Sequence, residues 1–182
     1  IYLYTDHSWL LFNTRVLDQA SDLTNPLLER CKFLSIFCSN LDEFFMVRVG
    51  SLYNESLTAP AAVDNKTGLT AAKQLAGISA VVAKGYRDRT AAFARLHKEL
   101  SRAGVRLLKA EELTPRQSEE CREYFIARVL PLTSVMVLDA KHPMVSFEIL
   151  KNYMMYELER DGRRMIGILF LNPAVERLYR IG

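Results

Sequence analysis

The feature that most constrains this chain is one long helical segment, predicted over residues 70 to 102. Thr70 is a good N-cap for it, and Gly104 follows its end as a C-terminal glycine should. At about 1.5 Å per residue the helix would be roughly 45 Å long. Its apolar residues recur at helical spacing: Leu75, Ile78, Val82, Phe93, Leu96 and Leu100. A long helix with one apolar stripe needs partner helices, so the segment predicts a bundle.

The residues before this segment supply candidate partners. Ser8 is the predicted N-cap of a first helix extending to about residue 20. Asn25 and Pro26 resemble an N-cap followed by a proline at the first helical position, which predicts a second helix. Residues 27 to 38 are apolar on most faces, so this helix is expected to be central and largely buried.

A polar tetrad, residues 39 to 42, follows the second helix. Ser39, with Asp42 three residues later, resembles a capping box, although Asp replaces the usual Glu or Gln. This pattern predicts a break or kink near residue 39 or 40 and a third helix from residue 41 to about residue 57. Residues 58 to 69 are rich in turn-forming residues and predict the connection to the long helix.

The sequence pattern changes after Gly104. A short strand is predicted at residues 105 to 108, and Thr114 with Gln117 forms a capping box that opens a helix to about residue 129. Residues 132 to 138 are β-branched and apolar, and residues 139 to 143 form a predicted loop. Asp161-Gly162 separates two strand-like runs, 153 to 159 and 165 to 171, which is a strong hairpin signal.

These patterns predict a mainly α chain of two domains. Residues 1 to 103 form an N-terminal helical bundle domain, and residues 104 to 182 form the beginning of an α+β domain with a β-hairpin. The last residues do not resemble a natural domain end, so the second domain is expected to be incomplete. The first residue is not Met, which suggests a trimmed chain.

Composition excludes several classes of protein. Apolar residues make up 49% of the chain and charged residues 25%, which is a globular balance rather than a disordered or fibrous one. A net charge of +3 is too small to favour a nucleic-acid binder. No run of about 18 apolar residues and no secretory signal is visible. The odd cysteine count predicts buried thiols in a reducing cytoplasm, rather than a disulfide or a metal site: Cys31, Cys38 and Cys121.

Motif searching finds little chemistry. Phosphate-binding glycine loops, zinc signatures and nucleophile elbows are absent from the sequence. His7, His97 and His142 lie far apart in sequence, and each has an ordinary structural interpretation, so none is predicted as a catalytic base. Asp42 and Glu43 are a weak metal pair, because adjacent helical residues point about 100 degrees apart.

Two further clusters also have ordinary interpretations. Residues 154 to 156, Met-Met-Tyr, are interpreted as the core face of a strand rather than part of a cofactor site. The basic residues of the long helix, among them Lys84, Arg87 and Arg95, could face a phosphate chain. A solvated face balanced by Asp88 and Glu99 is the favoured interpretation.

Residues 39 to 48 are the most informative stretch. Free backbone N–H groups at a helix start there could hold an anion. Asn40 can both donate and accept, which suits a purine edge, and Arg48 lies eight residues later on roughly the same face. The alternative is structural: Ser39 caps, Asn40 fits a kink, and the acids favour a positive helix end. From the residues alone the structural alternative is favoured.

Three motifs in order resemble the N-terminal domain of bacterial polyphosphate kinase. They are Ser8-Trp9-Leu10 with Phe12-Asn13 and Arg15-Val16-Leu17, then Asn25-Pro26-Leu27-Leu28-Glu29-Arg30 with Lys32-Phe33-Leu34, then Ser39-Asn40-Leu41-Asp42-Glu43-Phe44 with Val47-Arg48. The match is dense over about residues 8 to 52. Residues 53 to 102 are similar only in length and helical character, and residues from 104 on are similar in layout to the start of that family's head domain.

The resemblance implies a function that composition does not show. Such kinases reversibly transfer the terminal phosphate of ATP to inorganic polyphosphate through a phosphohistidine, with Mg²⁺. Their phosphorylated histidine and metal ligands lie in two C-terminal domains, so no catalytic residue and no metal ligand of the family falls on this chain, which alone is expected to be inactive. The family's nucleotide-binding asparagine falls on Asn40, in a helical domain that forms a wall of the pocket near the adenine.

The resemblance also implies partners and location. ATP or ADP and polyphosphate are the expected substrates, and the head domain is expected to contribute to a homo-oligomer in the full-length protein. A cytoplasmic location is expected, with peripheral membrane association left open. The rival hypothesis is a non-catalytic helical interaction module that docks a partner through the long helix. In that case, residues 39 to 44 would only cap a helix.

Overall fold

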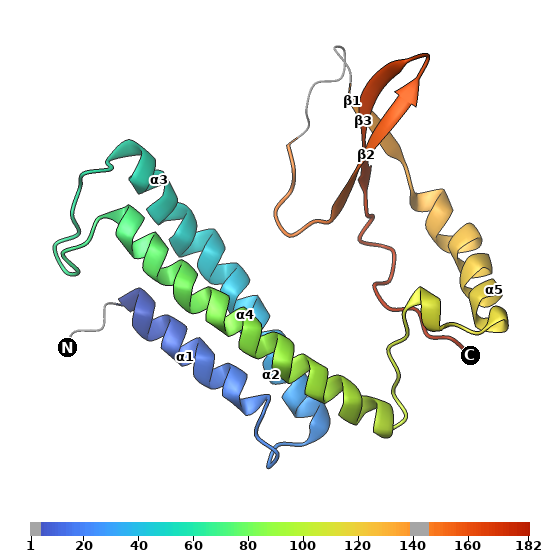
Figure 1. The fold of residues 1–182 in the computed structure, drawn as a ribbon, viewed down its shortest axis with the longest axis horizontal. Helices are drawn as coiled ribbons and strands as arrows, with labels where there is room; N and C mark the ends of the chain where they lie inside the picture. Colours follow the sequence, from blue (N-terminus) through green and yellow to red (C-terminus); the bar gives the residue numbers. More distant parts are fainter. Residues whose placement is uncertain (1–4, 139–145) are drawn as a thin grey trace. The chain divides into compact units, whose positions relative to one another are not determined.

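The computed structural model describes residues 5–138 and 146–182 (Figure 1). Within it the chain divides into two compact units, Ile1–Leu107 and Leu108–Gly182. His142 and the predicted loop at 139 to 143 lie outside the described residues. The fold is mainly helical with one small antiparallel sheet, as the sequence predicts. No helix in the described part combines the length and apolar character needed to cross a bilayer.

The first unit is a helical bundle whose longest member is the predicted helix α4. Its helices are α1 (Thr5–Gln19), α2 (Leu27–Phe44), α3 (Gly50–Thr58) and α4 (Ala71–Arg102), with a π-helical turn at Phe45–Val49. The side chain of Thr70 caps α4 by accepting a hydrogen bond from the Lys73 amide, and Gly104 has a φ of +88° just after its end. The limits of α4 are therefore confirmed.

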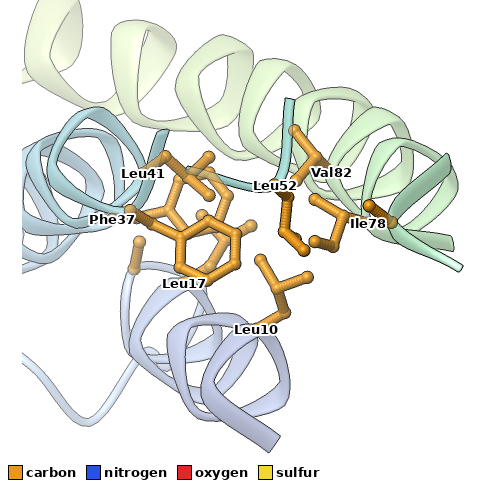
Figure 2. Close-up of a cluster of buried hydrophobic side chains, with 10 residues drawn as sticks. Leu10, Leu17, Phe37, Leu41, Leu52, Ile78 and Val82 are labelled. Carbon is orange, nitrogen blue, oxygen red and sulfur yellow. The ribbon is translucent and has the colours of Figure 1, made fainter. Parts of the chain in front are cut away.

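The core of the bundle is a cluster of apolar side chains contributed by all four helices. Figure 2 shows α1, α2, α3 and α4 converging on it through Leu10, Leu17, Phe37, Leu41, Leu52, Ile78 and Val82. Leu41, Leu52 and Ile78 are each no more than 2% exposed. Burial of this kind is the main force that holds four amphipathic helices together.

The predicted starts of the first two helices are wrong. Ser8 lies inside α1, which begins at Thr5, because the buried Asp6 accepts hydrogen bonds from Arg48 and this distant contact holds an extra turn. Asn25 does not cap α2. Its Nδ2 donates to the carbonyl oxygen of Gln19 instead, and Pro26 occupies the N-cap position.

The predicted break at residue 39 or 40 is also wrong. Helix α2 runs without interruption through Ser39 and Asn40 to Phe44, and the irregularity is the π-helical turn that follows. Ser39 behaves as a helix-interior serine, since its Oγ donates to the carbonyl oxygen of Ser35 at 3.3 Å. The capping-box interpretation of residues 39 to 42 therefore fails.

Helix α2 is less buried than its composition predicts. Its buried residues are Arg30, Phe37, Leu41 and Phe44. Leu28 is 65% exposed and Ile36 is 44% exposed. The helix therefore lies on the bundle with one face in the core, and the expectation of a largely buried central helix is corrected.

Arg30 ties three helices together from a buried position. It is 3% exposed. Its Nε donates to the carbonyl oxygen of Ala20 at the end of α1, and its two terminal nitrogens donate to the Glu99 carboxylate of α4 at 2.7 and 3.1 Å. This two-pronged geometry fixes α2 against α4 more specifically than a single ion pair would.

Acid should weaken this tie. Hydrogen bonds from Arg30 lower the pKa of Glu99 below its ordinary 4.5, against the opposing effect of desolvation. A carboxyl whose folded pKa is depressed contributes stability that is complete above its unfolded pKa and is lost as the pH falls through its folded pKa. The difference in free energy of unfolding between this chain and Glu99→Gln, measured with urea, should therefore shrink as the pH falls below 4.5. If this difference stays constant from pH 6 to pH 3, the Glu99 carboxylate does not contribute the pH-dependent stability assigned to it.

The second unit opens with the predicted capping box. The Gln117 amide donates to Thr114 Oγ1, and the Thr114 amide donates to Gln117 Oε1 at 3.0 Å. Helix α5 (Pro115–Tyr124) follows and continues as a π-helical turn at Phe125–Val129, so the helix predicted to residue 129 is confirmed. Residues 105 to 108 carry no strand, contrary to the prediction.

The sheet of the second unit contains the predicted hairpin. Strands β1 (Val135–Leu138), β2 (Tyr153–Arg160) and β3 (Arg163–Phe170) are antiparallel in the order β1-β3-β2. Asp161 and Gly162 both have positive φ, 53° and 72°, as the tight two-residue turn between β2 and β3 requires. Residues 154 to 156 are exposed, Met155 by 62%, so their interpretation as a core face is corrected.

Candidate functional site

The candidate site lies along the seam between α1 and α2. Asn40, Phe44 and Arg48 follow one another at intervals of four residues, which places them on one side of the helix. Each meets a side chain of α1: Asn40 bonds to Asn13, Phe44 stacks on Trp9 and Arg48 pairs with Asp6. Asn40 and Arg48 therefore lie on one face, as their spacing predicts, and the structure shows that this face meets α1.

Asn40 is held at one end of this seam by a buried partner. Its Nδ2 donates to Asn13 Oδ1 at 2.9 Å. Asn13 is 1% exposed, and its own Nδ2 donates to the carbonyl oxygen of Phe37 at 3.1 Å. Asn40 is itself only partly buried, so part of its side chain remains accessible to solvent.

The middle of the seam is aromatic. The rings of Trp9 and Phe44 are stacked, with centroids 4.6 Å apart and an angle of 11° between their planes. Phe44 is buried, whereas Trp9 is partly exposed. This stack separates the Asn40 end of the seam from the Arg48 end and keeps the two helices in register.

Arg48 and Asp6 close the other end. Arg48 Nε lies 2.8 Å from both carboxylate oxygens of Asp6. The Asp6 side chain is 7% exposed and that of Arg48 is 42% exposed. Since Asp6 balances the charge of Arg48, this pair acts first as a structural tie between the start of α1 and the π-helical turn.

The structure changes how residues 39 to 48 could hold a ligand. Because α2 continues through them, their backbone N–H groups lie within a helix, and the predicted anion site at a helix start is wrong. What remains for recognition is the side chain of Asn40. Asp42 and Glu43 are exposed, and among the described residues no three Asp, Glu, His or Cys side chains gather as a metal site would require.

His97 and Lys84 have ordinary structural contacts. His97 stacks on Phe93, and its Nε2 lies 3.3 Å from the carbonyl oxygen of Leu107. Lys84 pairs with Asp88 one turn later at 2.7 Å, as the solvated-face interpretation of α4 predicts. The three cysteines are free and partly buried.

Asn13 and Asp6 are the members of the site that sequence reasoning missed. Asn13 occupies a core position of α1, between Leu10 and Leu17 at helical spacing. A buried polar residue in an apolar stripe requires a hydrogen-bond partner, and that requirement was the available signal. The partner itself lies 27 residues away in sequence.

Comparison with known proteins identifies the family. The family described as "Polyphosphate kinase N-terminal domain" matches residues 2–108, more than half of the chain. This chain belongs to the polyphosphate kinase family. The match covers the whole helical bundle, including α1 and α2 with the seam between them.

The similarity to individual polyphosphate kinases extends into the second unit. The chain is 43% identical over 136 residues to the polyphosphate kinase of Exiguobacterium sp. (strain ATCC BAA-1283 / AT1b), which covers 75% of this chain and 19% of that protein. It is 37% identical over 183 residues to the Bacillus anthracis polyphosphate kinase, which covers 93% of this chain and 25% of that protein. The chain therefore spans a quarter or less of the length of these relatives.

A solved polyphosphate kinase shares the fold. The crystal structure of the enzyme from Porphyromonas gingivalis superposes with a TM-score of 0.71 at 29% sequence identity, and the similarity covers 91% of this chain and 24% of that one. The fold and the family are thus established together, whereas the roles of individual residues depend on the geometry of the seam.

Proposed function

We propose that this chain is part of a polyphosphate kinase that reversibly transfers the terminal phosphate of ATP to inorganic polyphosphate through a phosphohistidine. In this proposal the bundle forms one wall of the nucleotide pocket, and Asn40 hydrogen-bonds to the adenine. The single observation that supports it is the geometry of Asn40, whose partly exposed side chain is hydrogen-bonded to the buried Asn13.

The chemistry assigned to this chain is positioning. Phosphoryl transfer depends mainly on alignment of the reacting groups and on stabilisation of charge. Asn40, fixed by two successive hydrogen bonds, would orient the base, and so the phosphates, for the rest of the protein. Mg²⁺ would neutralise phosphate charge, but the described residues provide no cluster of ligands for it. Its ligands and the reacting histidine are proposed to lie elsewhere in the whole kinase.

Asn40→Ala in the complete kinase tests this proposal. The variant should lower kcat/KM for ATP by about tenfold, which corresponds to about 1.4 kcal/mol of lost hydrogen bonding. The fold should persist, because leaving the Asn13 oxygen without its donor costs only about 1 to 2 kcal/mol. Steady-state kinetics and thermal unfolding of the same preparations provide the two measurements.

Ser39→Ala is the matched control. Ser39 neighbours Asn40, is exposed, and donates to the carbonyl of Ser35 in its own helix, so kcat/KM for ATP should not change. If Asn40→Ala retains full kcat/KM while its melting temperature collapses, Asn40 is a purely structural residue and the proposed base contact is wrong.

The rival hypothesis is a non-catalytic helical module that docks a partner through α4. The family match to polyphosphate kinase favours the kinase. Oligomerisation through residues 104 to 182 and a cytoplasmic location remain proposals that follow from the family resemblance. A kinase assay on the complete protein, with ATP and polyphosphate as substrates, separates the two hypotheses directly.

A further inference from the structure

The amide of Asn13 can adopt only one orientation. Its Nδ2 donates to the carbonyl oxygen of Phe37, and a carbonyl can only accept a hydrogen bond. Asn13 Oδ1 must therefore point away from Phe37, where it accepts from Asn40 at 2.9 Å. Since Asn13 is 1% exposed, water is not available to replace either partner.

The fixed orientation of Asn13 also determines the orientation of the Asn40 amide. If the Asn40 amide were rotated by half a turn, its oxygen would face the oxygen of Asn13, and two acceptors would meet without a proton between them. Asn40 is therefore held with Nδ2 toward α1. Among the hydrogen bonds of the described residues, the Asn40 side chain makes the one to Asn13, so its Oδ1 and the second N–H of Nδ2 remain for a ligand.

We propose that Asn13 is a positioning residue that sets the selectivity of the site for adenine over guanine. The inference depends on the proposed contact between Asn40 and the base. Adenine carries an amino donor at position 6 beside an acceptor nitrogen, and guanine carries an oxygen acceptor at position 6. With its oxygen toward the amino group of adenine, the held amide of Asn40 complements that base, whereas a guanine in the same placement would present its oxygen to Asn40 Oδ1.

A freed Asn40 would lose this discrimination. Without Asn13, the Asn40 amide can rotate and offer its NH₂ group to guanine as readily as it offers its oxygen to adenine. Asn13 does not itself reach the nucleotide in this scheme, because it is buried beneath Asn40. Its effect should appear in the choice of base rather than in catalysis as a whole.

The test compares ATP and GTP as substrates of the complete kinase. Asn13→Leu keeps the number and branching of the side-chain heavy atoms and removes both hydrogen bonds, and it should lower the ATP-to-GTP ratio of kcat/KM by about tenfold. If Asn13→Leu does not fold, Asn13→Ser removes the same bridge with a smaller change in polarity. Gln74→Leu is the matched control, because Gln74 is also 1% exposed and its Nε2 donates to the carbonyl of Leu69, a contact separate from Asn40.

The outcomes separate this inference from the proposed function. A reduced ratio in the Asn13 variant and in Asn40→Ala, with an unchanged ratio in Gln74→Leu, supports the inference. If Asn40→Ala weakens ATP use but Asn13→Leu keeps the parent ratio, Asn13 does not set selectivity and only this inference fails. If a folded Asn40→Ala keeps both ATP kinetics and the ratio, the base contact itself is refuted. An equal change in Gln74→Leu would overturn the inference, because loss of stability alone would explain it.

Discussion

Arg30→Met is expected to lower the free energy of unfolding of the helical bundle by about 2 to 3 kcal/mol. The Arg30 side chain is 4% exposed and donates to both Ala20 and Glu99. Methionine fills much of the same volume but supplies no donor. The loss should stay below that of a fully buried pair, because the stranded Glu99 carboxylate is 32% exposed and can be hydrated.

Lys32→Met is the matched control for this variant. Lys32 lies on the same helix, and its ion pair with Glu29 is exposed, so its loss should cost no more than about 0.5 kcal/mol. Urea unfolding followed by fluorescence measures both, since Trp9 is the only tryptophan of the chain and reports on the bundle. Equal effects of the two substitutions would mean that Arg30 is not a tie between helices.

Elements specified by local chemistry were predictable from the sequence. Thr70 and Gly104 mark the two ends of α4 within one turn of it. Thr114 and Gln117 satisfy each other's backbone across three residues, and Asp161-Gly162 is a turn signal complete in two residues. In each case the residues that form the structure are close in sequence, so the contact can be predicted from the local sequence pattern.

Two errors concern polar side chains that resemble helix caps but make a different hydrogen bond. Asn25 and Ser39 both resemble caps, but one bonds to Gln19 and the other bonds within its own helix. The propensity of such residues for helix ends is a weak prior, because the same side chains can bond instead to nearby backbone carbonyls, as a serine inside a helix does to the carbonyl one turn earlier. Continuous helix through Ser39 also removes the anion site that a break there would have created.

The candidate site was only partly accessible to sequence reasoning because the partners of its residues are distant in sequence. Asn40 followed from the family resemblance, and its place on one helix face with Arg48 followed from spacing. Their partners lie 27 and 42 residues away, in α1. Pairing across helices depends on how the bundle packs, and helical periodicity along one segment does not specify which residue of another segment it meets.

Leu41→Ala should destabilise the bundle more than Arg30→Met does, with a loss of about 3 to 4 kcal/mol in the free energy of unfolding. Leu41 is 2% exposed and lies in the cluster that unites the four helices (Figure 2). Alanine removes three carbon atoms from a packed interior. The loss combines the missing transfer free energy with the cost of a cavity that helices from several directions cannot close.

Leu28→Ala makes the same chemical change on the same helix and serves as its control. Leu28 is 65% exposed, so its truncation leaves no cavity and should alter the free energy of unfolding by less than about 0.5 kcal/mol. Urea unfolding monitored by Trp9 fluorescence again gives both values. A loss below about 1 kcal/mol for Leu41→Ala would show that the bundle closes around the missing atoms or that this cluster is not its core.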